Sequence, residues 1–343
     1  GKQMLMDMML RGVVDEIRRS GRWRETWVSF LMVYAASGPV RNEKFPVLGF
    51  GKRDPDRPGL LVPNPFFVTP KWWDDVEEAA RDLSAQRPWR SRSSKVLFRG
   101  ACGPGAHARL ELLRLPDPED RLDVGFTKVD GFASMYECVK DLAAPRNVNA
   151  SSRDVDLVMR HRLKAMIPQA NYSKYRYLLH MPGSATGSYS RNLQYLWAHG
   201  AIVLIWKHAA REWYYQHLRD RVHYLSVDAS NLYDVLRELD ADPQLQLKLR
   251  RGGQQFAFKF LSGRTLVDRW HAILAVLQDR QVREPTIPRD ACTCDPRLLN
   301  DTRVVVKACQ KCEITAKKGR TISKFVGLVP KAAKASLGGA SSS

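Results

Sequence analysis

The sequence predicts an α/β protein that is built around a parallel, Rossmann-like sheet. Short apolar runs alternate with helical patterns between residues 96 and 277, which is typical of strand–helix–strand units. Residues 201–206 are apolar without interruption, as expected of a strand that is buried on both faces. Of the 343 residues, 44% are apolar and 27% are charged, which are ordinary values for a folded globular protein. The composition therefore excludes a collagen, a coiled-coil rod and a wholly disordered chain.

The first part of the chain predicts a smaller unit with one long helix, two strands and a second helix. Apolar residues recur at helical spacing over residues 4–17, which predicts an amphipathic helix. Residues 27–34 and 45–50 predict two short strands. Thr69 and Pro70 then have the residue types of a helix N-cap and of the first helical position.

A basic, polar segment at residues 87–94 marks a domain boundary. We expect an N-terminal domain at residues 1–90, a Rossmann-like domain at residues 91–285, and a Cys-containing extension with a basic, Ser/Gly-rich tail at residues 286–343. In the middle domain, strands are predicted at residues 96–99, 175–181, 201–206 and 222–227, and helices at residues 107–113, 190–199 and 212–218, with further helices to residue 277. Gly200 is placed just after a helix, where a left-handed backbone favours glycine.

The chain is strongly basic, with 55 Lys and Arg residues against 36 Asp and Glu residues and a formal net charge of +19. Such a field attracts anions, including nucleotides, polyanionic glycans, nucleic acids and acidic membranes. A nucleic-acid partner is not favoured, because no helix-turn-helix, RNP or zinc-finger pattern is present. From residue 316 onward the basic residues have no acidic counterpart, and this tail is predicted to be disordered. It either keeps the protein soluble or contacts a polyanion or a membrane surface.

No apolar run approaches the roughly 20 residues that a membrane span needs. No signal-peptide pattern opens the chain. Because residue 1 is Gly rather than Met, a signal or a membrane anchor could precede this chain, and the sequence does not indicate a cytosolic protein.

Two junctions between a strand and a helix carry the residues of a phosphate-binding site. Residues 100–109 contain three glycines and end on Arg109, and Ala101 lies at their start. Residues 183–191 supply a second set of candidates, Gly183, Ser184, Ser190 and Arg191. Free backbone N–H groups at a helix N-terminus favour phosphate, and an Arg can clamp a diphosphate with two hydrogen bonds. The alternative is that both loops are plain tight turns.

Several short segments also occur in a recognisable order: residues 95–100 (KVLFRG), 174–178 (KYRYL), 200–203 (GAIV), 212–215 (EWYY) and 223–227 (HYLSV). Together with Arg109 and Leu112, they resemble the CAP10-type glycosyltransferases, the family of protein O-glucosyltransferases and capsule xylosyltransferases. The resemblance implies a GT-B fold, in which two Rossmann-like domains face a cleft and the N-terminal domain lies on the acceptor side. It implies the transfer of a hexose or pentose from a UDP-sugar to a hydroxyl group of a protein or glycan. The implied reaction is inverting and independent of metal ions. The UDP-sugar is the co-substrate, and no cofactor is implied. The implied location is the secretory pathway, in the endoplasmic reticulum lumen or the Golgi.

The resemblance assigns roles to individual residues as well. It places UDP along Ala101, Arg109 and the loop at residues 183–191. Family members usually carry the second Arg two residues after a Ser, whereas Arg191 directly follows Ser190 here, and Asn192 is the alternative contact. Glu212 stands where a carboxylate could accept hydroxyl groups of the ribose or the sugar. The alternative role of Glu212 is to cap its own helix or to form an ion pair there.

An inverting transferase needs a base that takes the proton of the acceptor hydroxyl as it attacks. In the family this base is an Asp after a strand of the N-terminal domain, and the corresponding position here is Ser37. Serine without an activating partner is a poor base near neutral pH, and Asp54 and Asp56 are the nearest carboxylates. The chain therefore either uses another base or is a catalytically silent member that binds a nucleotide-sugar or a glycan.

Four of the six cysteines, Cys292, Cys294, Cys309 and Cys312, form two pairs near the C-terminus. A luminal protein would join them in disulfides. Their spacing also resembles a zinc knuckle, although the first pair is unusually short. Free thiols are the third interpretation. Cys102 and Cys138 lie far from this cluster in the sequence, and Cys102 is interpreted as a small core residue rather than a nucleophile.

Overall fold

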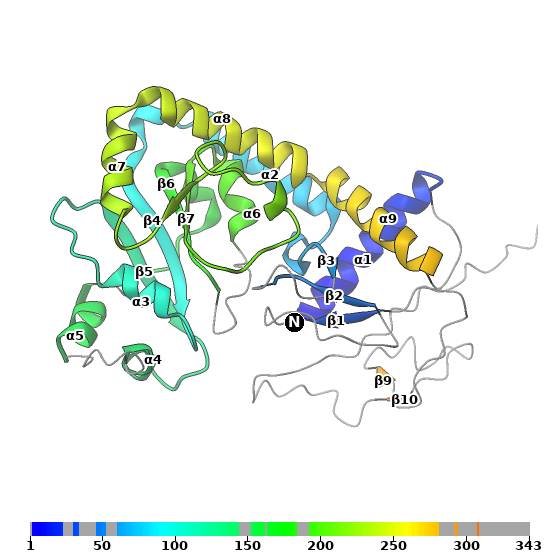
Figure 1. The fold of residues 1–343 in the computed structure, drawn as a ribbon, viewed down its shortest axis with the longest axis horizontal. Helices are drawn as coiled ribbons and strands as arrows, with labels where there is room; N and C mark the ends of the chain where they lie inside the picture. The colour runs from blue at the N-terminus through cyan, green and yellow to red at the C-terminus, as the bar shows by residue number, and fades with distance from the viewer. Residues whose placement is uncertain are drawn as a thin grey trace, which may run out of the picture.

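The fold centres on a five-stranded parallel sheet with the strand order β5-β4-β6-β7-β8 (Figure 1). The computed structural model describes residues 2–22, 30–33, 46–52, 60–143, 152–161, 163–183, 192–280, 292–293 and 307–308. The strands of the sheet are β4 (Ser93–Cys102), β5 (Leu122–Val129), β6 (Tyr175–His180), β7 (Ile202–Trp206) and β8 (Leu225–Val227). The parallel α/β sheet that the sequence predicts is thereby confirmed.

Two elements of this region differ from the sequence-based expectation. The sequence pattern does not reveal β5, which pairs along most of the length of β4. The helix predicted at residues 212–218 is wrong, because the segment contains only a short 3-10 turn, η6 (Tyr215–His217). Glu212, Trp213 and Tyr214 are buried in succession, which a surface helix with a single apolar face cannot provide.

Alternate residues of the strands divide between two hydrophobic cores, one on each face of the sheet. In β6, Leu178 belongs to the first core, whereas Tyr177 and Leu179 belong to the second. The second core is closed by α3 (His107–Leu113), α4 (Met135–Ala143), α5 (Ser152–His161) and α7 (Leu232–Ala241). The first core is closed by α1 (Lys2–Arg19), α2 (Pro70–Ala85), α9 (Gly263–Arg280) and the second half of α8 (Pro243–Phe260).

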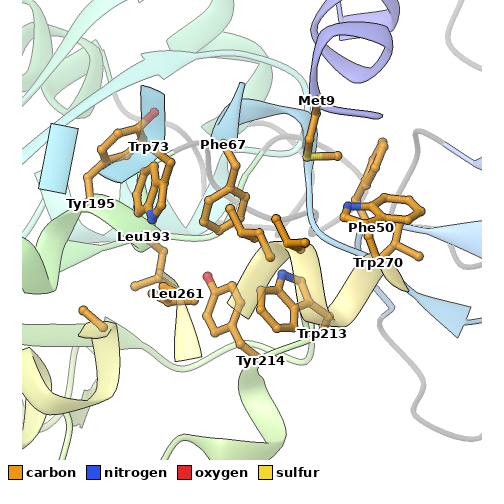
Figure 2. Packing of buried hydrophobic residues seen from close by; sticks show 14 of the residues in the cluster. Met9, Phe50, Phe67, Trp73, Leu193, Tyr195, Trp213, Tyr214, Leu261 and Trp270 are labelled. Carbon is orange, nitrogen blue, oxygen red and sulfur yellow. The ribbon is translucent and has the colours of Figure 1, made fainter. Parts of the chain in front are cut away.

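The N-terminal part of the chain belongs to the first core. Besides α1 and α2, it contains η1 (Pro65–Phe67) and a small parallel sheet of β1 (Leu31–Val33), β2 (Val47–Gly49) and β3 (Leu60–Leu61). Trp73 of α2 packs edge-on against Phe67 of η1, with 4.7 Å between ring centroids, and against Tyr195, at 4.8 Å (Figure 2). Tyr195 lies in α6 (Leu193–Leu196), which follows β6. Segments on both sides of residue 90 therefore share one continuous core.

Both ends of α2 are held by specific contacts. Thr69 acts as the predicted N-cap, since its Oγ1 accepts a hydrogen bond from the backbone N–H of Trp72 at 3.2 Å. At the other end, the buried Arg92 donates from Nη2 to the carbonyl oxygen of Ser84 and from Nη1 to that of His199, each at 2.9 Å. His199 closes the 3-10 turn η5 (Trp197–His199). The positive charge of Arg92 thus lies against the negative ends of two helical segments.

The structure confirms Gly200 as a left-handed helix terminus, with a φ of 61°. The other described elements are η2 (Trp89–Ser91), η4 (Gln169–Lys174) and the paired strands β9 (Cys292–Thr293) and β10 (Lys307–Ala308). Of the helices in the described ranges, none is both long and apolar enough to cross a lipid bilayer. The basic tail from residue 316 onward lies outside the described residues.

Candidate functional site at the carboxyl ends of the strands

The carboxyl ends of β4 and β6 form the candidate site. Because all five strands are parallel, the loops that follow them leave at one edge of the sheet. The chain passes from β4 to β5 on one side, whereas β6, β7 and β8 follow on the other side. Open α/β sheets bind ligands at such a switch point, where neighbouring loops diverge. Both phosphate loops that the sequence predicts begin here.

Arg109 lies across this switch point, in the first turn of α3. Its Nη1 donates to the carbonyl oxygen of Ala101, near the end of β4, at 2.7 Å. Its Nε and Nη2 donate to the carbonyl oxygen of Pro182, just after β6, at 3.1 and 2.9 Å. The buried Gly183 follows Pro182 directly. The structure therefore brings together three residues that the sequence assigns to the nucleotide, namely Ala101, Arg109 and Gly183.

Arg109 keeps both its charge and part of its hydrogen-bonding capacity. Burial lowers the pKa of the guanidinium to about 10, so Arg109 stays protonated near neutral pH. A guanidinium has five N–H groups, and the three bonds described use one on each nitrogen. Two N–H groups thus remain without a partner among the described residues. A planar guanidinium with two such groups can bind a phosphate or a carboxylate.

A disulfide joins the end of β4 to α4. Cys102 is bonded to Cys138, 36 residues further along the chain, and both cysteines are buried. Cys102 is a buried core residue, as the sequence predicts, but its bond to Cys138 is not predicted from the sequence. The pairing depends on β5, which carries the chain back along β4 before α4 begins, and the sequence pattern does not reveal that strand. The bond fixes the residue that directly follows Ala101.

Two buried histidines lie next to the switch point, and sequence reasoning misses both. His180 ends β6 and His208 follows β7, and their ring centroids are 5.5 Å apart. Burial lowers the pKa of His180 well below its ordinary range, and His208 and Arg109 lower it further. Burial, aided by Arg211, lowers the pKa of His208 to about 4, so both rings are neutral near pH 7. Each histidine lies at the end of a buried apolar run or just after one, and a polar residue in that position is the signal that could have revealed them.

Glu212 lies in the interior, where it forms hydrogen bonds and no ion pair with the described residues. It is 3% exposed, and its Oε2 accepts from Asn64 Nδ2 at 2.9 Å, while Oε1 accepts from the Tyr214 hydroxyl at 3.3 Å. The fully buried Gln194 of α6 donates to Asn64 Oδ1 at 3.4 Å. Burial raises the pKa of Glu212 to about 8, against the lowering effect of the Asn64 and Tyr214 hydrogen bonds. The carboxyl group is therefore mostly protonated near neutral pH.

Several sequence-predicted residues fall outside the described ranges. These are Ser37, Asp54, Asp56, Ser184, Ser190, Arg191, Cys294, Cys309 and Cys312, while only the backbone of Cys292 is described. Asn192, the alternative to Arg191, donates from Nδ2 to the Tyr172 hydroxyl at 3.2 Å. Within the part of the chain that the structure describes, no three His, Cys, Asp or Glu side chains gather as metal ligands.

Comparison with known proteins identifies the wider group to which the sequence is similar. The family model for glycosyl transferase family 90 matches residues 66–320. Protein O-glucosyltransferase 1 of the mouse is 27% identical over 207 residues, which cover 59% of this chain and 46% of the mouse protein. The human protein of the same name is 27% identical over 208 residues, with the same coverage. This chain spans about half the length of the curated relatives that it matches.

Solved structures show a more distant likeness. HepE of Anabaena in complex with UDP-glucose is 14% identical, with a TM-score of 0.38, over 58% of this chain and 53% of HepE. A glycosyltransferase of Rickettsia africae is 11% identical, with a TM-score of 0.37, over 68% of this chain and 64% of that protein. Both TM-scores lie below 0.5, and the family assignment does not rest on them.

The buried carboxyl group of Glu212 predicts a fall in stability as pH rises. The pKa of Glu212 is about 8 in the folded protein against 4.5 for an ordinary Glu. Between these pH values the unfolded chain loses the proton that the folded protein keeps. Glu212 should therefore destabilise the fold progressively from about pH 4.5 to pH 8, by on the order of 4 kcal/mol at the upper end. Glu212→Gln should remove this contribution, because an amide does not ionise. Its oxygen can accept from Asn64 Nδ2, and its NH2 group can donate to the Tyr214 hydroxyl oxygen.

Urea unfolding of wild type and Glu212→Gln between pH 5 and 8 measures the effect. The two proteins should be similar near pH 5, and the variant should be the more stable at pH 8. Glu78→Gln, on the exposed face of α2, is the matched control and should follow wild type. Parallel pH profiles of wild type and Glu212→Gln would show that Glu212 ionises normally in the folded protein.

Proposed function

This chain belongs to glycosyl transferase family 90, and from that premise we propose that it transfers a hexose or pentose from a UDP-sugar to a hydroxyl group of a protein or glycan. The proposed transfer inverts the configuration at the anomeric carbon and needs no metal ion. The observation that carries the proposal is the position of Arg109 across the carboxyl ends of β4 and β6. A cation at this switch point is suited to a nucleotide diphosphate.

Arg109 also supports a metal-free mechanism. As the bond between the sugar and UDP breaks, negative charge builds up on the departing diphosphate. Preorganised donors that face this charge stabilise the transition state, and a water-poor surrounding strengthens them. The two remaining N–H groups of Arg109, in a guanidinium already fixed by two backbone carbonyls, meet this requirement. Glucose is the first sugar to test, since the curated relatives are named protein O-glucosyltransferases.

The architecture and the compartment are part of the proposal. The small parallel sheet β1-β2-β3 supports a second Rossmann-like unit on the acceptor side of a GT-B cleft. The disulfide between Cys102 and Cys138 supports an oxidising compartment, such as the endoplasmic reticulum lumen or the Golgi. Disulfides persist in such compartments and are rare in the cytosol.

Hydrolysis of the donor, with water in place of the acceptor hydroxyl, tests the reaction. The protein is incubated with UDP-glucose or UDP-xylose, and UDP release is followed with and without EDTA. We expect release from at least one of them, and we expect EDTA to leave the rate unchanged. Circular dichroism of the chelated sample checks that the fold is intact, because Cys292, Cys294, Cys309 and Cys312 could hold zinc. A loss of activity with EDTA that manganese restores would refute the metal-free mechanism.

Arg109→Ala should weaken UDP binding by about 1.5–3 kcal/mol, the usual contribution of a hydrogen bond to a charged group. The binding constant from isothermal titration calorimetry would change about 10- to 150-fold. Arg109→Lys retains the charge and should fall between wild type and the Ala variant. Arg237→Ala, which removes an exposed Arg of α7, is the control. A folded Arg109→Ala protein with wild-type affinity would remove Arg109 from the donor site.

Ser37→Asp should raise transfer if Ser37 occupies the position of the catalytic base, since a positioned base typically contributes about 10²–10⁴-fold in rate. UDP affinity should stay unchanged, because the donor binds mainly to the second half of the chain. Ser37→Asn has a similar shape without a base and should not raise the rate. Initial rates of sugar transfer and UDP titrations provide the comparison.

Two other results would have clear meanings. If wild type is active and Ser37→Asp abolishes activity, another residue is the base, and Asp54→Asn and Asp56→Asn identify whether it is one of these carboxylates. If wild type and Ser37→Asp both bind UDP but neither turns over any UDP-sugar, the chain is a silent nucleotide-sugar or glycan binder rather than an enzyme.

A further inference from the structure

Arginine side chains gather at the opposite edge of the sheet, where the strands begin. There η2 directly precedes β4, and Arg176 is the second residue of β6. Figure 1 shows α8 lying across the end of the sheet at which β4 begins. From this helix, Arg250 donates with Nε to the carbonyl oxygen of Gly200, just before β7, at 3.2 Å. We call six arginines of this region the basic edge: Arg87, Arg90, Arg92, Arg176, Arg250 and Arg251.

The half-buried ring of Trp89 is the centre of the basic edge. The Cζ atom of Arg250 lies 4.1 Å from the ring centroid, and those of Arg92 and Arg176 lie 5.7 and 5.8 Å from it. A cation at such a distance from an aromatic ring is attracted to it. Arg176 also donates from Nη2 to the carbonyl oxygen of Arg90 at 2.9 Å. Three guanidinium groups are thus fixed around one ring.

No carboxylate balances these charges within the described ranges, where none of the six arginines forms an ion pair. Burial, together with the charges of Arg250 and Arg87, lowers the pKa of Arg92 to about 10, so Arg92 stays protonated near neutral pH. Burial and the charge of Arg251 lower the pKa of Arg250. The cations repel one another, and a bound anion would relieve this repulsion.

The basic edge also keeps unused hydrogen-bond donors. Arg250 donates only from Nε, so both of its terminal nitrogens lack a partner among the described residues. Arg87 donates only from Nη1. The side chains of Arg90 and Arg251 are exposed and form no hydrogen bond with a described residue. A guanidinium with free terminal N–H groups can bind an oxyanion through two parallel hydrogen bonds.

The solvent face of α8 extends the basic edge along the surface. None of the 18 residues of this helix is an Asp or a Glu. Lys248, Arg251 and Lys259 are exposed, and their spacing places them on one side of the helix. From Lys248 to Lys259 the helix rises by about 16 Å. The surface is therefore suited to an extended polyanion rather than to a single small anion.

An acidic glycan fits this surface better than a nucleic acid or a membrane does. The Cys102–Cys138 disulfide favours an oxidising compartment, which lies outside the cytosol. The negative surface potential of membranes belongs to their cytoplasmic leaflet, which such a protein would not face. No nucleic-acid-binding pattern occurs in the sequence. In addition, arginine binds discrete oxyanion groups in a fixed geometry, whereas attraction to a charged bilayer needs only the charge.

We propose that the basic edge and the solvent face of α8 bind an acidic glycan, whose sulfate or carboxylate groups the arginines hold. The ten residues of β4 place this surface about 30 Å from the carboxyl edge of the sheet. It is therefore a docking surface separate from the candidate donor site, and the inference does not depend on the proposed reaction.

Calorimetric titration with a heparin oligosaccharide of defined length, at 150 mM salt, tests the proposal. Arg90→Ala/Arg251→Ala removes two exposed side chains that bind no described residue. We expect the double variant to bind the oligosaccharide roughly 10-fold more weakly, as loss of two exposed ion pairs would. Lys128→Ala/Lys140→Ala is the matched control, because it removes the same charge from exposed positions in β5 and α4. The control should stay within about twofold of wild type.

Two further measurements accompany the titration. UDP affinity should be the same in wild type and Arg90→Ala/Arg251→Ala, because the two edges of the sheet are far apart. Circular dichroism checks that the variant folds, and Arg251→Ala alone replaces it if it does not, with a smaller loss expected. Wild type is also titrated with a single-stranded oligonucleotide of matched charge and with vesicles of phosphatidylserine and phosphatidylcholine. It should bind the heparin oligosaccharide more tightly than either.

Three outcomes would overturn the proposal. If both double variants lose affinity equally, the glycan is attracted only by the net charge of the chain. If Arg90→Ala/Arg251→Ala binds the oligosaccharide as wild type does, the basic edge is not the binding surface. If wild type prefers the oligonucleotide or the vesicles, and the variant loses that binding instead, the partner is a nucleic acid or a membrane.

Discussion

The parallel direction of all five strands is the constraint on which the candidate site depends. It brings every loop that follows a strand to one edge, where carbonyl groups beyond the last strand-to-strand hydrogen bond need other partners. Arg109 satisfies two of them, those of Ala101 and Pro182, from a single side chain. The group that closes the ends of β4 and β6 is also a cation with unused N–H groups. One residue thus holds the fold together here and, in the proposed function, also binds the anionic diphosphate.

The same pairing of guanidinium and carbonyl recurs away from the site. Arg92 binds the ends of α2 and η5, Arg176 donates to the carbonyl oxygens of Trp89 and Arg90, and Arg250 donates to that of Gly200. Arg250 also lies over the Trp89 ring, with 4.1 Å between its Cζ and the ring centroid. A chain with a formal charge of +19 cannot pair each cation with a carboxylate. Here backbone carbonyls and an aromatic face take the place of the missing acids.

Local patterns in the sequence predicted the elements whose signals are local. The Thr69 cap, Gly200 and the apolar strand β7 each follow from a few neighbouring residues, and the structure confirms them. By contrast, β5 carries polar residues at Asp123, Thr127 and Lys128, so its pattern resembles a loop. Because β5 is not predicted, the pairing of Cys102 with Cys138, which depends on β5, is not predicted either.

The residues of the candidate site also divide into those with a local signal in the sequence and those without one. Ala101, Arg109 and Gly183 could be found because loops rich in glycine next to apolar strands are visible in the sequence. The burial of Glu212 against Asn64 could not, since these residues are 148 positions apart. Nor could the pairing of His180 with His208, because it requires knowing that β6 and β7 are neighbours.

The disulfide has a consequence for how the sheet edge is assembled. The covalent ring that it closes begins at the last residue of β4 and contains α3, Arg109 and β5. A slip of one residue between these strands would turn side chains to the opposite face and would move Cys102 away from Cys138, beyond the short span that a disulfide can bridge. The two thiols can therefore form the disulfide when β4 and β5 are in register. A molecule that carries the bond has the end of β4, next to the Ala101 carbonyl that Arg109 binds, tied to α4, so the state of these two sulfur atoms reports how this edge of the sheet is built.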